Sequence, residues 1–226
     1  MRDEQELLTH PPSLIARHAI TSPDRQRLRH TMRQRRVAVP ADAQRIVAAR
    51  IARYLRRYVL RKGMRIAIYA AFDGEVDLAP TVAVAHRLQC QLFAPRITEA
   101  RTRAMEFMPL SPRKVQRRSR LGMLEPQNKL HQRINPRYLN LILIPVVAFD
   151  AYGWRLGFGG GYYDRKLAFK RRGSYRQPLL IGVGYEFQRV APTTPAAWDV
   201  LLDAVVTETG WHRCQRQYFS PIETKT

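Results

Sequence analysis

The feature that most constrains this chain is the stretch of residues 139–167, LNLILIPVVAFDAYGWRLGFGGGYYDRKL. An apolar segment with the composition of a buried strand ends at Pro145, and four glycines follow within residues 157–161. Glycine permits positive φ angles and lets a ligand approach peptide N–H groups closely. Residues 162–172 have helical composition, and a helix N-terminus favours anions. The stretch therefore predicts a phosphate site built by backbone, with Arg155 and Asp164 at its two ends.

The glycines match neither of two common phosphate-binding signatures. No Lys-Ser or Lys-Thr pair follows them, which excludes the P-loop, and the third glycine of the dinucleotide-binding pattern would fall on Tyr162. A glycine-rich hairpin without function is the alternative interpretation. The charged residues Arg155 and Asp164 on either side of the loop argue against it.

Composition limits the class of protein. With 226 residues, 45% of them hydrophobic, the chain is long enough for one domain with a full core. No segment approaches the ~18 consecutive apolar residues of a membrane-spanning helix. The first residues also lack the apolar region of a signal peptide, so a cytoplasmic protein is expected. Cys90 and Cys214 have no metal-binding or redox spacing, and no disulfide between them is expected.

The formal net charge of +21 indicates an anionic partner. Two interpretations remain open: a surface that attracts anionic small ligands, or a dedicated nucleic-acid face. The basic residues are dispersed along the chain, and aromatic residues are not interleaved with them in an RNA-binding motif. The first interpretation is therefore favoured.

Periodicity and capping residues predict alternating helices and strands. Helices are expected over residues 22–36, capped by Ser22, and over 41–62, 78–89 and 162–172. Strands are expected over 66–72, 90–94, 105–108, 138–144, 179–185 and 204–207, and loops over 111–135. This order predicts an α/β fold, a mostly parallel sheet with helices on both faces in a single Rossmann-like three-layer domain. The domain is expected over residues 22–210, between a mobile N-terminal arm (1–21) and a C-terminal tail (211–226). In such folds ligands bind at the carboxyl ends of the strands, where loops 73–77 and 145–164 are expected.

Residues 153–165 read G-x-R-L-G-x-G-G-G-Y-Y-D-R, a string that resembles the signature of the 5-formyltetrahydrofolate cyclo-ligase family, also called methenyltetrahydrofolate synthetase. Further agreement lies in the arginine-rich first helix, the acidic turn of residues 73–77, the GMLEP segment of residues 122–126 and the stretch of residues 198–207. The resemblance covers residues 22–208.

The resemblance implies an enzyme that closes 5-formyltetrahydrofolate to 5,10-methenyltetrahydrofolate with ATP and Mg²⁺, releasing ADP and phosphate. The γ-phosphoryl group passes to the formyl oxygen, and the N10 nitrogen then attacks the activated carbon. This chemistry needs charge neutralisation and alignment rather than a protein nucleophile. The expected partners are ATP and 5-formyltetrahydrofolate, which can be polyglutamylated, and the protein is expected to be a monomer.

The same resemblance implies roles for individual residues. Arg155 and Asp164 are the implied catalytic residues, and Asp164 and Asp203 the implied metal ligands, with Asp199 as the competing acid. Ala70, Glu75 and Tyr162 are the implied folate-binding residues; Glu75 as a plain turn acid and Tyr162 as a buried aromatic are the alternatives. The implied ATP-binding residues are Arg25, Arg29, Arg155, Leu156, Gly157, Phe158, Gly159, Gly160, Gly161, Tyr162 and Tyr163. Arg25 stands where the family usually has lysine, and Phe158 where some relatives have a basic residue.

Two other classes of protein fit part of the sequence. An RNA-associated basic protein on the same fold would explain the charge. A sugar-phosphate isomerase or thioester-transfer enzyme would fit the α/β fold. Neither enzyme alternative accounts for the glycine loop between Arg155 and Asp164.

Overall fold

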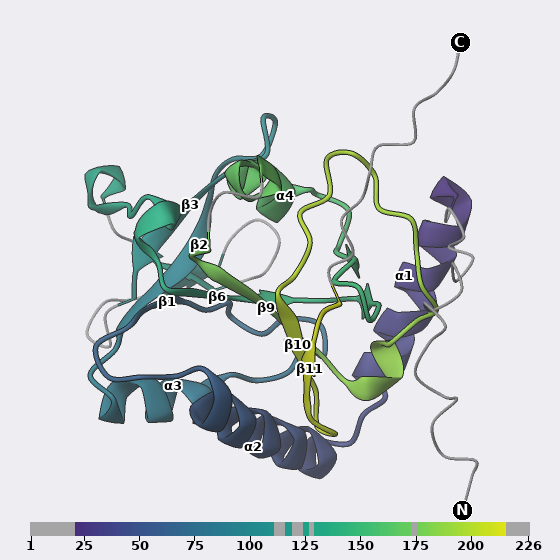
Figure 1. Cartoon of the computed structure of the whole chain (residues 1–226), viewed down its shortest axis with the longest axis horizontal. Coiled ribbons are helices and arrows are strands. Elements are labelled where there is room, and N and C mark those ends of the chain that lie inside the picture. The colour runs from purple at the N-terminus through teal and green to yellow at the C-terminus, as the bar shows by residue number, and fades with distance from the viewer. Residues whose placement is uncertain (1–20, 111–115, 119–123, 127–128, 173–175, 216–226) are drawn as a thin grey trace, which may run out of the picture.

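A seven-stranded β-sheet forms the centre of the molecule (Figure 1). The structure is a computed structural model that describes residues 21–110, 116–118, 124–126, 129–172 and 176–215. In sheet order the strands are β11 (Trp211–Arg213), β10 (Ala204–Val206), β9 (Leu179–Val183), β6 (Leu141–Pro145), β1 (Arg65–Ala67), β2 (Gln91–Glu99) and β3 (Ala104–Pro109). The five strands from β10 to β2 run parallel, and β11 and β3 are antiparallel edges. The predicted mostly parallel sheet is confirmed.

Both faces of the sheet are buried, which explains the continuous apolar run in β6. Leu141 and Leu143 belong to the core on one face, and Ile142 and Ile144 to the core on the other. Figure 1 shows α2 (Ala41–Tyr58) and α3 (Ala79–Arg87) side by side beneath the sheet, with α4 (Tyr162–Lys166) on the opposite side. The predicted three-layer arrangement is therefore confirmed, since side chains alternate along a strand and each set needs its own cover.

The first helix, α1 (Ser22–Val37), packs against a small hairpin rather than against the sheet. The hairpin consists of β7 (Ala148–Phe149) and β8 (Arg155–Leu156). Met32 of α1 is buried in a separate apolar cluster with Trp154 and Leu156. The predicted cap was displaced by one residue: Thr21, not Ser22, has the extended backbone of an N-cap, and its side chain accepts a hydrogen bond from Asp24 N. This packing places an arginine-rich helix beside the glycine loop.

Several predicted boundaries were wrong. β1 ends at Ala67 rather than at residue 72, and α2 ends at Tyr58 rather than at 62. The helix predicted over residues 162–172 is a single short turn, α4, followed by a 3-10 segment, Ala168–Arg172. Composition alone does not show where the chain must turn to reach its next neighbour. A helix as short as α4 also has little of the macrodipole on which the anion argument relied.

Besides the hairpin of β7 and β8, three further strands lie where none was predicted. β4 (Gln116–Arg118) and β5 (Leu124–Pro126) form an antiparallel pair in the region predicted as loops. β11 extends the sheet past residue 210, the expected end of the domain, because its residues pair with β10. Short 3-10 segments, Leu130–Gln132, Pro136–Tyr138 and Glu186–Gln188, connect other elements. Residues 1–20 of the expected arm and 216–226 of the expected tail lie outside the described residues.

The strand order places a crevice between β1 and β6. From β1 the chain passes to β2 on one side, and later returns to β6 on the other side of β1. Such a reversal leaves a gap at the carboxyl ends of the two strands, where ligands bind in open α/β sheets. Cys90 and Cys214 form no disulfide, and none of the described helices combines the length and the apolar character needed to cross a membrane.

The turn after β1 contacts α1 at its backbone. Gly74 has a φ of +73°, and a Cβ atom built there would lie 2.9 Å from the carbonyl carbon of Arg36. Gly63 has nearly the same φ, +74°, but nothing within 4 Å of its Cβ position. Both glycines therefore adopt the left-handed backbone conformation, and only Gly74 also lies in close contact with the backbone of another segment.

We predict that Gly74→Ala destabilises the protein more than Gly63→Ala. Both substitutions incur left-handed strain of about 1 kcal/mol, and only Gly74→Ala adds overlap with backbone atoms, about 1–3 kcal/mol more. Urea unfolding of both variants measures the difference in the free energy of unfolding. Equal losses would show that the turn does not depend on its contact with α1.

Candidate functional site

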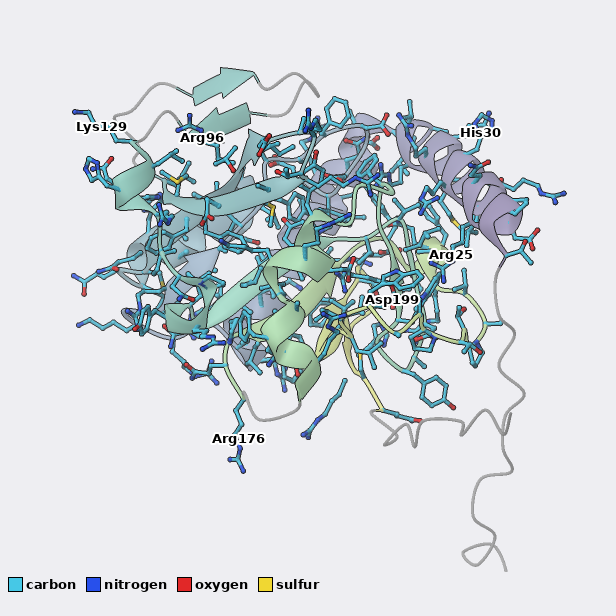
Figure 2. The ribbon with its side chains drawn as sticks, turned by 90° about the horizontal axis from the view of Figure 1, so that it is seen from above. Arg25, His30, Arg96, Lys129, Arg176 and Asp199 are labelled. Carbon is cyan, nitrogen blue, oxygen red and sulfur yellow. The ribbon has the colours of Figure 1, made fainter. Side chains whose placement is uncertain are left out.

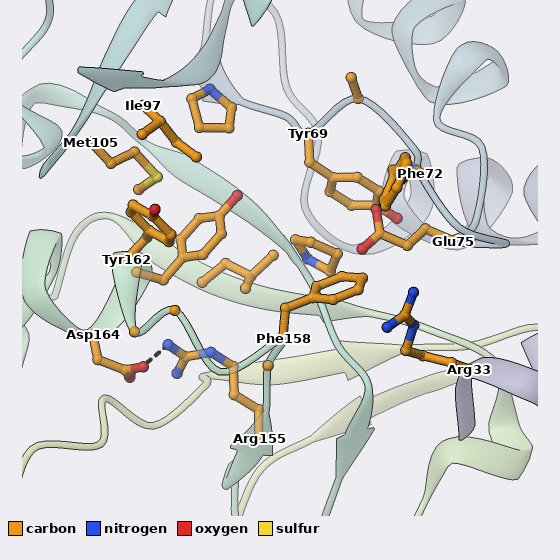
Figure 3. A pocket seen from close by; sticks show the side chains of 18 residues that line it. Arg33, Tyr69, Phe72, Glu75, Ile97, Met105, Arg155, Phe158, Tyr162 and Asp164 are labelled. Atoms are coloured by element: carbon orange, nitrogen blue, oxygen red, sulfur yellow. Dashed lines mark hydrogen bonds and ion pairs between the residues drawn. The ribbon is translucent and has the colours of Figure 1, made fainter. Parts of the chain in front are cut away.

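A pocket of about 460 Å³ opens at the carboxyl ends of β1 and β6 (Figure 3). Its walls come from the segment after β1, from β2 and β3, from the end of β6, and from the glycine loop with α4. The lining residues are Arg33, Tyr69, Ala70, Phe72, Glu75, Pro95, Ile97, Met105, Ile144, Pro145, Arg155, Gly157, Phe158, Gly160, Gly161, Tyr162, Tyr163 and Asp164. The pocket thus joins the two loops that the sequence placed at the carboxyl edge.

The glycine loop has the backbone of an anion cradle. Gly159 and Gly161 have positive φ angles, +101° and +65°. A Cβ atom on Gly160 would lie 2.5 Å from the ring of Tyr162, so no side chain fits there without moving that ring. Within the described part of the chain, the backbone N–H groups of residues 158–161 donate no hydrogen bond to protein. These amides are available to a ligand.

Arginines bind the carbonyl groups of the loop. Arg29 Nε donates to Gly157 O at 2.8 Å, and Arg165 Nη1 donates to Gly160 O at 3.1 Å. Burial and the neighbouring Arg25 lower the pKa of Arg29. Carbonyl oxygens repel phosphate, and their engagement by cations removes part of that repulsion. Arg29 thus acts on the loop from α1 even though it is absent from the pocket lining.

The two predicted catalytic residues form one ion pair. Arg155 Nη2 lies 2.7 Å from Asp164 Oδ1, and the Arg155 side chain is only 5% exposed against 25% for Asp164 (Figure 3). Arg155 Nη1 also donates to Val200 O, and Asp164 Oδ1 accepts from Val200 N at 3.0 Å. Two partners hold the guanidinium in place at the pocket wall. A charge fixed before the ligand arrives stabilises developing negative charge without reorganisation.

The residues at the phosphate side fit a magnesium ion held mainly by phosphate. Asp164 has one carboxylate oxygen, Oδ2, without a partner among the described residues, and it lines the pocket. Mg²⁺ is commonly bound by one or two carboxylates plus phosphates and water. Groups of three or more His, Cys, Asp or Glu side chains that could hold a metal are absent from the described ranges. Of the two implied metal ligands, Asp164 lines the pocket and Asp203 does not.

The structure does not bring Asp203 to the pocket. Asp203 precedes β10, at the amino end of the parallel strands; its Oδ2 accepts from Leu180 N at 2.8 Å and lies 3.9 Å from Lys170 Nζ. Asp199, the competing acid, accepts from Ala196 N within its own turn. The positions of Asp199 and Asp203 relative to the pocket depend on how their segments pack against the sheet. Spacing along the chain therefore could not show whether either acid reaches the pocket.

The other side of the pocket is apolar and aromatic with a single buried carboxylate. Tyr69, Phe72, Phe158, Tyr162 and Tyr163 line the pocket, and Figure 3 shows Glu75 beside Tyr69 and Phe72. The Glu75 side chain is 4% exposed, and Oε2 accepts from Phe72 N at 3.2 Å. Flat rings bind between aromatic walls, and a carboxylate recognises their N–H groups.

Burial raises the pKa of Glu75 from its ordinary value of 4.5 to about 7. The nearby Arg36 guanidinium and the Phe72 N–H act in the opposite direction, and Asp73 adds to the rise. The pKa values of Tyr69 and Tyr163 are also raised, first by burial and then by the charge of Glu75. The carboxyl group therefore changes charge near neutral pH, and the two tyrosines remain protonated.

Four implied ATP-binding residues, Arg25, Arg29, Leu156 and Gly159, lie outside the pocket lining. Leu156 is buried in the α1–hairpin cluster, and its carbonyl oxygen accepts from Val147 N at 2.8 Å. Gly159 lies against the Arg29 guanidinium, 3.5 Å from its Cβ position to Cζ. Arg25 Cζ lies 5.8 Å from the centre of the Trp154 ring. These residues surround the glycine loop on its α1 side.

The residues predicted from the sequence did not include Arg33 or most of the apolar residues that line the pocket. Arg33 lines the pocket, and its Nε lies 2.6 Å from Asp73 Oδ2. Arg25, Arg29, Arg33 and Arg36 recur at intervals of four, four and three residues, which places them on one helical face. That spacing could have indicated Arg33. Ile97 and Met105 come from β2 and β3, and no local pattern connects them to the glycine loop.

The basic residues outside the site are spread over the surface. Figure 2 shows His30, Lys129 and Arg176 projecting from different sides of the molecule. Lys129 and Arg176 are exposed. Dispersed charge raises attraction for anions in general and does not define one binding face.

Comparison with known proteins gives consistent results. A model of the 5-formyltetrahydrofolate cyclo-ligase family matches residues 21–208. The 5-formyltetrahydrofolate cyclo-ligase of Escherichia coli K12 is 29% identical over 177 residues, covering 78% of this chain and 96% of that protein. The solution structure of Aquifex aeolicus 5,10-methenyltetrahydrofolate synthetase has a TM-score of 0.70 at 28% identity, over 88% of this chain and 97% of that one. A Mycoplasma pneumoniae 5,10-methenyltetrahydrofolate synthetase shares the fold, with a TM-score of 0.65 at 24% identity over 82% of this chain and 99% of that one.

We predict that Glu75 makes stability depend on pH. The folded state binds the Glu75 proton up to a pKa of about 7 and the unfolded chain only up to 4.5, so stability is lost as pH rises between these values. The loss is about 3 kcal/mol at most. Urea unfolding at pH 5 and pH 8 should show that Glu75→Gln gains stability relative to wild type at the higher pH. The same difference at both pH values would contradict a raised pKa.

Proposed function

Because this chain belongs to the 5-formyltetrahydrofolate cyclo-ligase family, we propose that it closes 5-formyltetrahydrofolate to 5,10-methenyltetrahydrofolate in the pocket between β1 and β6. The reaction consumes ATP with Mg²⁺ and releases ADP and phosphate. The family resemblance seen in the sequence is confirmed, and the chain is an enzyme. The substrates, the metal ion and the residue roles are our inference for this protein.

The observation that carries the proposal is the meeting of two unlike surfaces in one pocket. One consists of unbonded loop amides with Arg155 and Asp164, and the other of aromatic side chains around Glu75. A triphosphate fits the first surface, and a reduced pterin ring fits the second. Phosphoryl transfer needs the formyl oxygen and the terminal phosphorus aligned within a few ångströms. A shared pocket supplies that alignment.

In the proposed reaction, amides of residues 158–161 and the Arg155 guanidinium stabilise the negative charge on the transferring phosphoryl group. Asp164 orients Arg155 through Oδ1 and would hold the metal ion, which neutralises phosphate charge, through its other oxygen. Ionised Glu75 accepts hydrogen bonds from the N–H groups of the pterin, and Tyr162 stacks on its ring. The phosphorylated formyl group then has a good leaving group when N10 attacks.

The direct test is an assay of the purified chain with 5-formyltetrahydrofolate. We expect the near-ultraviolet absorbance of the methenyl product to appear with MgATP, and not without ATP or with excess chelator. Absence of product under all conditions would overturn the proposal. We do not extend the proposal to RNA, because the exposed basic side chains are dispersed (Figure 2).

We predict that Arg155→Ala and Asp164→Asn each lower turnover at least tenfold, about 1.4 kcal/mol in the barrier. Because the two side chains form one pair, the double variant should lose much less than the product of the single losses. Arg171→Ala is the matched control, since Arg171 is exposed and, within the part of the chain that the structure describes, donates only to carbonyl groups outside the pocket. Near-normal rates for both single variants, with circular dichroism unchanged, would remove the proposed phosphate site.

We also predict that Glu75→Gln weakens use of the folate and spares ATP. The amide keeps one acceptor and loses the charge, so KM for 5-formyltetrahydrofolate should rise at least tenfold and KM for ATP should change less than twofold. In wild type, kcat/KM for the folate should rise with pH up to about 7 as Glu75 ionises. The variant should lack this rise. An unchanged folate KM would rule out the assigned role.

A further inference from the structure

A fully buried arginine lies behind the folate side of the pocket. Arg36, in the last turn of α1, is 1% exposed. Its Nη2 donates to Asp73 O at 2.9 Å and lies 3.3 Å from Asp73 Oδ2. Its Nη1 lies 3.9 Å from Glu75 Oε1. One guanidinium thus lies next to both Asp73 and Glu75 of the turn that follows β1.

The contact between this turn and α1 is rigid. The backbone of Arg36 approaches Gly74 so closely that no Cβ atom fits between them. The Phe158 ring of the glycine loop covers the guanidinium, with its centre 5.3 Å from Arg36 Cζ. Three segments distant in the sequence, α1, the acidic turn and the glycine loop, therefore meet at one side chain.

Two nitrogen atoms of Arg36, Nε and Nη1, are buried without a hydrogen-bond partner in the described structure. An unsatisfied buried donor on a charged group is costly, so an arginine that served only to anchor the turn would be a poor choice. Nη1 faces the Glu75 carboxylate at a distance about 1 Å beyond a hydrogen bond. A small movement of Glu75 closes this gap.

We propose that Arg36 is a positioning residue for Glu75: it holds the 73–75 turn on α1 and orients the Glu75 carboxylate toward the pterin ring of the substrate. This inference rests on the proposed function. Helix α1 would then have two tasks. Its Arg29 binds the glycine loop on the phosphate side, and its Arg36 fixes the Glu75 carboxylate on the folate side. Arg36 itself does not line the pocket and acts through Glu75.

The groups around Glu75 determine how the loss of Arg36 would change the pKa of this carboxyl group. Arg36 and Arg33 approach from α1, Asp73 lies in the same turn, Tyr69 follows β1, and Tyr163 comes from α4. Of the charged groups acting on Glu75, Arg36 is the cation that lowers its pKa, and Asp73 raises it. Loss of Arg36 therefore raises the pKa of Glu75 further, and less of the carboxylate is ionised at neutral pH.

The experiment compares Arg36→Met, which keeps the length and removes the charge, with Arg36→Lys, which restores the charge. For Arg36→Met we expect a folate KM at least tenfold higher, an ATP KM within twofold of wild type, and an acid limb of kcat/KM for the folate shifted up by about one pH unit. Arg36→Lys should recover most of the pH shift. Arg35→Met is the matched control and should behave as wild type, because Arg35 is exposed and its contacts within the described residues are with Phe187, to whose carbonyl it donates and over whose ring it lies.

A cycle with Glu75→Gln separates positioning from folding. If Arg36 acts through Glu75, adding Arg36→Met to Glu75→Gln should change the folate KM less than twofold. The inference would be overturned if the two changes in folate KM multiplied in the double variant, or if Arg36→Met had the wild-type folate KM and pH profile. Either result would leave the enzyme assignment standing. If Arg36→Met does not fold, Asp73→Asn tests the same contact: it removes the carboxylate that Arg36 binds, so the folate KM should rise, and the acid limb should shift down because Asp73 raises the pKa of Glu75. Absence of turnover in wild type would instead overturn the proposed function.

Discussion

Parallel pairing of five strands, buried on both faces, is the constraint on which the rest of this structure depends. It requires a connection across the sheet between each parallel strand and the next one along the chain, and it brings the carboxyl ends of all five to one edge of the sheet. The reversal of strand order between β1 and β6 then separates two loops just enough to admit a ligand. The acidic turn and the glycine loop face each other because of this topology.

Charge in the pocket is organised by pairing rather than by accumulation. The protein has a net charge of +21, yet the cations nearest the site are each bound to a carboxylate or a carbonyl group: Arg155 to Asp164, Arg33 to Asp73, and Arg29 to Gly157 O. Paired cations have defined positions, which a phosphoryl transfer needs more than it needs a strong field. The dispersed surface arginines can attract anionic substrates over longer distances.

The buried charged groups have different partners on the two sides of the pocket. Near the glycine loop, the buried Arg155 guanidinium forms an ion pair with Asp164. On the other side of the pocket, burial raises the pKa of Glu75 by more than Arg36 and the Phe72 N–H lower it, so this pKa is about 7. Arg36 limits that rise from behind. The packing of α1 on the turn therefore adjusts the chemistry of a residue on another element.

The sequence by itself determined the central parallel strands, the first three helices, the α/β class and the position of the glycine loop. Apolar runs, capping residues and glycine positions are local properties, and they also showed the family resemblance. Only the tertiary structure decided that Arg155 and Asp164 form a single pair, that Asp203 lies at the other edge of the sheet, and that Ile97, Met105 and Arg36 border the site. These facts depend on which strands are neighbours and on where α1 packs. Both follow from burial of the whole sheet, which no short segment of sequence contains.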